Sequence, residues 1–299
     1  MEIRTPNATV NPWWLAIRPK TLSASVAPVA VGTALAAHDH HLLIPAALAA
    51  LVGALGIQIG TNLTNDVLDF RRGADTDARV GPTRVVQAGL LSERAVTWGA
   101  LAAFGMAMLA GLYLIAVAGW PILLLGGVSI VCGVLYTAGP LPLAYLGLGD
   151  LFVWVFFGVA AVAGTYYVQA SRISLAAVWM GLAVGALAVA LLAVNNLRDI
   201  PTDRSAGKRT LAVRMGDGWT REYIAALLIA AFALPPMLAA WQLVGRGAFA
   251  VLLAVPLAAA PVRSVLRGTA GRDLNPVLGM IARLQIVYAA LLTAGLLID

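Results

Sequence analysis

The chain has 299 residues, of which 61% are hydrophobic and 11% are charged, and its formal net charge is +6 at pH 7. Soluble domains carry about 25% charged residues, so this composition excludes a soluble globular protein and indicates one embedded in a lipid bilayer. The single cysteine, Cys132, excludes an internal disulfide and a cysteine-based zinc site. The positive charge does not indicate nucleic-acid binding, because the basic residues gather at the joints between apolar segments.

Nine segments are apolar and long enough to cross a bilayer, which takes about twenty helical residues. The sequence therefore predicts an all-α integral membrane protein, a bundle of nine transmembrane helices in a single polytopic domain over residues 1–299. In chain order the predicted spans lie near 21–37, 42–64, 95–117, 120–139, 149–170, 174–196, 222–243, 247–266 and 278–298.

The basic residues are distributed unevenly between the two sides of this bundle. Counted over the alternate joints, 17 of the 20 Lys and Arg residues fall on the side of the N-terminus. The positive-inside rule then places the N-terminus in the cytoplasm and the C-terminus outside, across the inner cell membrane. Two cytoplasmic joints are long, at 65–92 and 197–220, and both are rich in Asp.

These two loops begin with the same pattern, an Asn followed four residues later by an Asp. The first holds Asn65 and Asp69, and the second holds Asn195, Asp199 and, four residues further, Asp203. Residues four apart share one face of a helix, so each helix end presents a stripe of oxygen ligands. We expect the two loops to lie side by side.

The ends of both motifs leave alternatives open. Pro201 has the potential to break the turn that aligns Asp203 with Asp199. In the first loop Gly73 ends the helix, and either Asp75 or Asp77 supplies a third acid. The remaining acids are expected to be solvated or to cap helices, namely Asp66, Asp77, Glu93, Asp217, Glu222 and Asp273.

Carboxylate and amide oxygens are the ligands that Mg²⁺ prefers. Acids alone would suggest a path for cations, whereas acids mixed with several cations suggest a metal-bound polyanion. A diphosphate is the simplest such polyanion. The cations interleaved with the acids are Arg71, Arg72, Arg79, Arg84, Arg198, Lys208 and Arg209.

Several stretches resemble the UbiA superfamily of intramembrane aromatic prenyltransferases, over most of the chain from "RPKTLSASVAPVAVG" to about Arg214. The branch that prenylates 1,4-dihydroxy-2-naphthoate in menaquinone synthesis is the most similar. The superfamily's first motif is N-x-x-x-D-x-x-x-D, and its last position is Gly73 here, so the third acid is displaced as in that branch. The stretches are "NDVLDFRRGADT", "RVGPTRVVQAG", "YTAGPLPLAYLGLGD" and "NNLRDIPTDRSAGKRTLAVRMG".

The resemblance implies a central cavity beneath the two Asp-rich loops, in which a polyprenyl diphosphate ionises and its prenyl group passes to the naphthoate. Diphosphate and CO₂ are lost, and demethylmenaquinone is the product. Mg²⁺ is the implied cofactor, and its candidate ligands are Asn65, Asp69, Asp75, Asn195, Asp199 and Asp203. The cations implied to neutralise the diphosphate are Arg18, Lys20, Arg72, Arg84, Arg198, Lys208 and Arg209, of which Lys20 and Arg84 are expected at the reacting end.

Two alternatives stay open at this point. A 4-hydroxybenzoate or similar acceptor would need another UbiA-type enzyme, and a membrane transporter would use intramembrane acids as an ion path. Prenyl chain length and oligomeric state are also open. The candidates to face an allylic cation through their rings are Tyr136, Tyr145, Tyr166 and Tyr167.

Overall fold

A computed structural model describes residues 11–73, 80–81, 83–136 and 143–299. Within these ranges the chain is helical and contains no strand, as predicted. The α-helices are joined by short 3₁₀ turns and one π-helical segment, all marked η here. The elements are α1 (Pro12–Ile17), α2 (Pro19–His38), α3 (Ile44–Arg71), α4 (Glu93–Ala118), α5 (Trp120–Leu135), η1 (Leu143–Leu146), α6 (Gly149–Trp154), η2 (Val155–Ala160), α7 (Ala161–Ala170), α8 (Leu175–Ser205), α9 (Leu211–Ala240), η3 (Arg246–Ala254), α10 (Val255–Leu266), η4 (Gly271–Asp273) and α11 (Leu274–Ile298).

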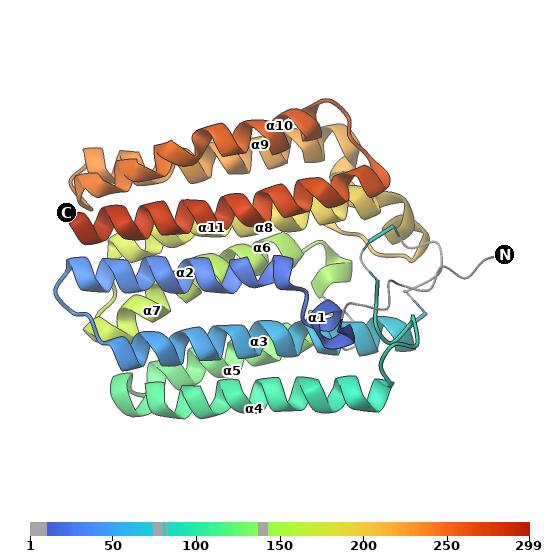
Figure 1. The fold of residues 1–299 in the computed structure, drawn as a ribbon, viewed down its shortest axis with the longest axis horizontal. Coiled ribbons are helices and arrows are strands. Elements are labelled where there is room, and N and C mark those ends of the chain that lie inside the picture. Colours follow the sequence, from blue (N-terminus) through green and yellow to red (C-terminus); the bar gives the residue numbers. More distant parts are fainter. Residues whose placement is uncertain (1–10, 74–79, 82, 137–142) are drawn as a thin grey trace.

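The long helices run side by side along one axis (Figure 1). Eight helical segments of the described chain are apolar and long enough to cross a membrane: α2, α3, α4, α8, α9, and the combined segments Gly149–Ala170, Arg246–Leu266 and Gly271–Ile298. The ninth predicted span appears as α5, which is apolar but has 16 residues. Within the described residues each predicted span is therefore helical, which confirms the prediction of an all-α integral membrane bundle.

Side-chain caps start several of these helices. Ser92, Ser174 and Thr210 each accept a hydrogen bond from a backbone N–H three residues later, at the first turns of α4, α8 and α9. Such caps satisfy amides that have no partner inside the helix. The caps fix where each helix begins even though the segments that follow are almost uniformly apolar.

Helix α8 lies at the centre of the bundle, and most of its length is buried against α2, α9 and α11. Glycines let its neighbour approach closely: a Cβ on Gly158 of η2 would lie 2.5 Å from the carbonyl oxygen of Gly181. Small residues at such crossings are typical of membrane helices. This contact holds the α6–α7 span firmly against α8.

The structure corrects the predicted loop boundaries. Helix α3 continues to Arg71 and α8 to Ser205, so the loops begin later than the predicted 65 and 197, and the acid motifs lie on helix ends as their spacing predicted. Pro201 lies inside α8 without ending it, so Asp199 and Asp203 belong to one helix despite the backbone hydrogen bond that a proline removes. Helix α9 already begins at Leu211, and Gly216, with φ of 79°, marks a kink within it.

Candidate active site

A cavity of about 800 Å³ lies between α2, α3, α5, the α6–α7 span and α8. Both acid motifs line it: Asn65 and Asp69 from α3, and Asn195, Asp199 and Asp203 from α8. The ends of α3 and α8 that carry the motifs lie at the same end of the bundle (Figure 1). The prediction that the two motifs lie side by side is therefore confirmed, and they converge on one space.

Asp69 is the buried acid that α3 contributes to the cavity wall. Its Oδ2 accepts a 2.7 Å hydrogen bond from Arg84, and both side chains are buried. The Nζ of Lys208 lies 3.9 Å from its Oδ1, which has no hydrogen-bond partner within the described part of the chain. The Asp69 carboxylate thus links two cations, one from the connection between α3 and α4 and one from the connection between α8 and α9.

Asp66 is not the solvated or capping acid that the sequence suggested. Its side chain is buried and accepts hydrogen bonds from the backbone N–H groups of Val85 and Val86, at 3.3 and 3.2 Å. Leu63, Val85 and Val86 belong to one small apolar cluster beneath this turn. Asp66 therefore fixes the turn that carries Arg84 toward Asp69.

Arg198 is buried inside the bundle and lies outside the described lining of the cavity. Its guanidinium forms two bonds with Asp199, at 2.8 and 2.6 Å, and further bonds with Asn195 at 2.7 Å and Asn275 at 2.8 Å. A bidentate Arg–carboxylate pair fixes both distance and orientation. Arg198 therefore holds two of the motif residues in place, and its own predicted role at a diphosphate stays a prediction.

The other predicted cations divide by position. Lys208 and Arg72 lie over the ring of Tyr145, at 5.0 and 5.7 Å from its centre. Arg209 donates its backbone N–H to the Tyr145 carbonyl at 3.1 Å, and its side chain is exposed. The cations among the described cavity-lining residues are Arg18, Lys20, Arg84 and Lys208.

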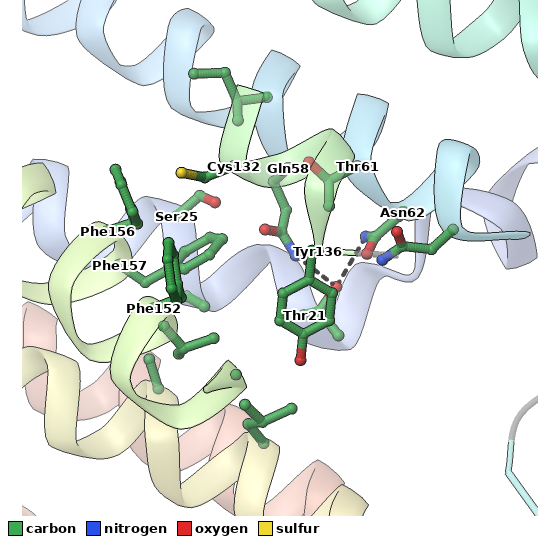
Figure 2. Close-up of a pocket in the computed structure, with 18 of the residues that line it drawn as sticks. Thr21, Ser25, Gln58, Thr61, Asn62, Cys132, Tyr136, Phe152, Phe156 and Phe157 are labelled. Atoms are coloured by element: carbon green, nitrogen blue, oxygen red, sulfur yellow. Dashed lines mark hydrogen bonds between the residues drawn. The ribbon is translucent and has the colours of Figure 1, made fainter. Parts of the chain in front are cut away.

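Aromatic side chains form part of the cavity wall. Tyr136 and Tyr145 line the cavity, as do Phe152 and Phe156, whose rings stack with centres 5.8 Å apart (Figure 2). Tyr166, a further candidate, bonds instead to Asp39 at the far end of α2 and does not belong to the described lining. Tyr167 is likewise outside it.

Sequence reasoning missed a polar group deeper in the cavity, made of Thr21 and Ser25 on α2 and Gln58 and Asn62 on α3 (Figure 2). Each pair is four residues apart, so each lies on one helix face. That spacing, within otherwise apolar spans, was the signal that could have identified them.

The oxygen atoms of the two acid motifs fit a Mg²⁺ ion that also binds a phosphate substrate. In the described residues no three His, Cys, Asp or Glu side chains are grouped closely enough to hold a metal by themselves. Mg²⁺ is usually bound through one or two carboxylates together with substrate phosphates. The buried Oδ1 of Asp69, which lacks a hydrogen-bond partner in that same part of the chain, is such a donor. Asp75 and Asp77 lie outside the described residues.

Sequence comparisons identify the family of the chain. Residues 25–277 match the model of the UbiA prenyltransferase family. The chain is 42% identical to the 1,4-dihydroxy-2-naphthoate octaprenyltransferase of Mycobacterium tuberculosis (strain ATCC 25618 / H37Rv), over 97% of this chain and 98% of that protein. It is 38% identical to the enzyme of the same name from Escherichia coli (strain K12), over 94% and 92% of the two chains.

Solved structures share the fold at low sequence identity. A UbiA homolog from Aeropyrum pernix K1 superimposes with a TM-score of 0.70 at 16% identity, over 93% of this chain and 98% of that one. A homolog from Archaeoglobus fulgidus bound to GPP and Mg²⁺ gives a TM-score of 0.62 at 16% identity, over 94% and 99%. With the family match spanning most of its length and full-length relatives above 30% identity, this chain belongs to the UbiA prenyltransferase family.

Proposed function

We propose that this protein transfers a polyprenyl group from a polyprenyl diphosphate to 1,4-dihydroxy-2-naphthoate, releasing diphosphate and CO₂ and forming the prenylated 1,4-dihydroxynaphthalene, which is the reduced, hydroquinone form of demethylmenaquinone. The observation that carries the proposal is the convergence of the two acid motifs, from α3 and α8, on one cavity with cations at one end and aromatic walls beyond. The relatives named above for the same naphthoate support the choice of acceptor.

The diphosphate lies between α3 and α8 in this proposal. Bound Mg²⁺ would neutralise its oxygens, and the residues that would hold the ion are Asn65, Asp69, Asn195, Asp199 and Asp203, with Asp75 a further candidate. Arg84 and Lys208, which already flank Asp69, reach the same oxygens and oppose the charge that develops as the diphosphate departs.

The reaction breaks the bond between the allylic carbon and the diphosphate oxygen, and the electron pair leaves on the diphosphate. The ring carbon that carries the carboxylate attacks the allylic carbon. The carboxylate then departs as CO₂, and its bonding pair returns to the ring. The rings of Tyr136, Tyr145 and Phe152 line the space in which positive charge develops and stabilise it by cation–π contact.

The membrane orientation is part of the proposal. The basic ends of α3 and α8 face the cytoplasm, which places the N-terminus inside and the C-terminus outside the inner cell membrane. A single polytopic domain over residues 1–299 carries the whole site. The apolar cavity suits a long prenyl chain, and the cytoplasmic mouth gives the charged diphosphate access from water.

The transporter alternative is not supported, because the chain belongs to a prenyltransferase family. Another UbiA-type acceptor, such as 4-hydroxybenzoate, remains the alternative within the enzyme class. Purified protein in liposomes, supplied with Mg²⁺, one polyprenyl diphosphate and both acceptors in competition, tests the choice. Prenylated naphthoate is expected, whereas prenylation of the benzoate alone would overturn the acceptor assignment.

A further inference from the structure

Two buried polar side chains inside the membrane-spanning part of the cavity keep oxygen atoms without a partner. Gln58 on α3 is 7% exposed, Ser25 on α2 is 2% exposed, and both line the cavity (Figure 2). Within the described residues, neither Oε1 of Gln58 nor Oγ of Ser25 has a hydrogen-bond partner. A buried polar atom left unsatisfied destabilises the folded state. Two of them on one cavity indicate a ligand that completes both.

The neighbouring Thr21 determines which atom Gln58 offers to that ligand. The Thr21 hydroxyl donates its single proton to the Arg18 carbonyl at 2.9 Å, so its oxygen can only accept from other groups. It accepts from Nε2 of Gln58 at 3.2 Å and from Nδ2 of Asn62 at 3.1 Å. This bond to Thr21 orients the Gln58 amide and uses one of its two N–H groups, so its carbonyl oxygen, an acceptor without a partner among the described residues, is left for the ligand.

The depth of Gln58 matches the spacing between a carboxylate and a hydroxyl on one aromatic ring. Gln58 lies four residues, or about 6 Å along the helix axis, deeper than Asn62. The guanidinium of Arg18 donates to the backbone carbonyl of Asn62 at 3.3 Å, so a positive charge lies at the level of Asn62. A carboxylate near Arg18 and a hydroxyl near Gln58 would be separated by the scale of an aromatic ring system.

The chemistry of the opposite wall favours the same occupant. Phe152, Phe156 and Phe157 line the cavity together with Gln58 and Ser25 (Figure 2). Flat aromatic rings pack well against such side chains. A prenyl chain has no hydrogen-bonding group, so in this position it would leave both oxygens unsatisfied.

We infer that Gln58 and Ser25 form the binding site for the hydroxyl group at ring position 4 of 1,4-dihydroxy-2-naphthoate, the hydroxyl farther from its carboxylate. That hydroxyl donates its proton to Oε1 of Gln58, and its oxygen accepts a hydrogen bond from the Ser25 hydroxyl. The pair thereby selects acceptors that carry a second hydroxyl. This inference rests on the proposed function, since it names the part of the same cavity that reads the acceptor.

The test compares two ligands in two proteins. The ligands are 1,4-dihydroxy-2-naphthoate and 1-hydroxy-2-naphthoate, which keeps the carboxylate and the adjacent hydroxyl but lacks the hydroxyl at position 4. The proteins are the unmodified chain and Gln58→Met, which keeps the side-chain length and removes the acceptor. Dissociation constants are measured by calorimetry in detergent, so that neither ligand has to be turned over.

Gln58→Met is expected to weaken binding of the dihydroxy ligand by about tenfold or more, as for a lost hydrogen bond that leaves its partner unsatisfied. The dissociation constant of 1-hydroxy-2-naphthoate should change by less than about threefold. Ser25→Ala should also weaken binding of the dihydroxy ligand more than binding of 1-hydroxy-2-naphthoate. Equal effects on both ligands, or no effect on either, would overturn the inference.

Two controls separate this inference from its rivals. Gln169→Met removes a glutamine that bonds at the other end of the bundle, outside the described cavity lining, and should leave both dissociation constants unchanged. A merely structural role for Gln58 predicts lower thermal stability and weaker binding of prenyl diphosphate as well. If the unmodified protein neither binds nor prenylates the dihydroxy ligand, the proposed function itself fails.

Discussion

Arg84 donates a 2.7 Å hydrogen bond to Asp69 and so links the turn that follows α3 to the last turns of that helix. The two side chains are 7% and 6% exposed, which makes this a buried ion pair. Removing one partner of such a pair costs about 3–5 kcal/mol, because the other charge is left without compensation. The pair fixes a carboxylate at the cavity wall before any substrate arrives.

The charge of Asp69 is expected to be essential for turnover. Asp69→Asn keeps the shape of the side chain but removes the anionic oxygen, and kcat should fall at least about 100-fold, or about 2.7 kcal/mol. Asp273→Asn, at an exposed acid before α11, serves as the matched control and should retain activity. An Asp69→Asn enzyme that keeps a tenth of its activity would contradict the assigned role.

Arg198 is expected to act by holding Asp199 and Asn195 in place. Lysine cannot form the paired bonds that arginine makes, so Arg198→Lys should lower kcat/KM by about tenfold or more, or about 1.4 kcal/mol, and should also lower the unfolding temperature. Arg204→Lys, at an exposed position on the same helix, should change neither. Full activity in Arg198→Lys would show that the paired bonds of Arg198 are dispensable.

Removal of the metal should abolish binding of the prenyl diphosphate while the protein stays folded. The protein treated with EDTA should lose activity, and a prenyl diphosphate should no longer raise its unfolding temperature. A ligand stabilises the folded state only as far as it binds that state. Mg²⁺ returned in excess should restore both readouts. Equal stabilisation by the diphosphate with and without the metal would argue that the residues bind the substrate unaided.

The membrane orientation predicts which face is accessible to labelling. Ser205 lies at the end of α8 and His41 lies between α2 and α3, at opposite ends of the bundle (Figure 1). In a Cys132→Ser background, Ser205→Cys should react with an impermeant thiol reagent only from the cytoplasmic face, and His41→Cys only from the other. The reverse pattern would invert the proposed topology.

The eight membrane-length helical segments of the described residues were predictable because the bilayer imposes its own length on apolar segments. Hydropathy was less informative about helix ends, since backbone hydrogen bonding in α3 and α8 continues past the first charged residue. The four-residue spacing of Asn65 with Asp69, and of Asn195 with Asp199, was enough to predict a shared site, because spacing fixes the face of a helix.

Individual partners were not predictable, since they depend on contacts between distant segments. Asp66 and Asp69 are both acids in one helix, yet one holds a backbone turn and the other meets Arg84. Arg198 lies in the most specific motif, but it bonds to Asn275 of α11 and to Asp199 and is not part of the described cavity lining. The choice between Asp75 and Asp77 as third acid stays a prediction.

The central claim is that the ring carbon bearing the carboxylate is also the carbon that receives the prenyl group. The most direct measurement uses 1,4-dihydroxy-2-naphthoate labelled in its carboxyl carbon, together with a polyprenyl diphosphate and the protein in liposomes. The account predicts that labelled CO₂ is released in a one-to-one ratio with prenylated product and with diphosphate. A prenylated product that retains the carboxyl label would contradict it.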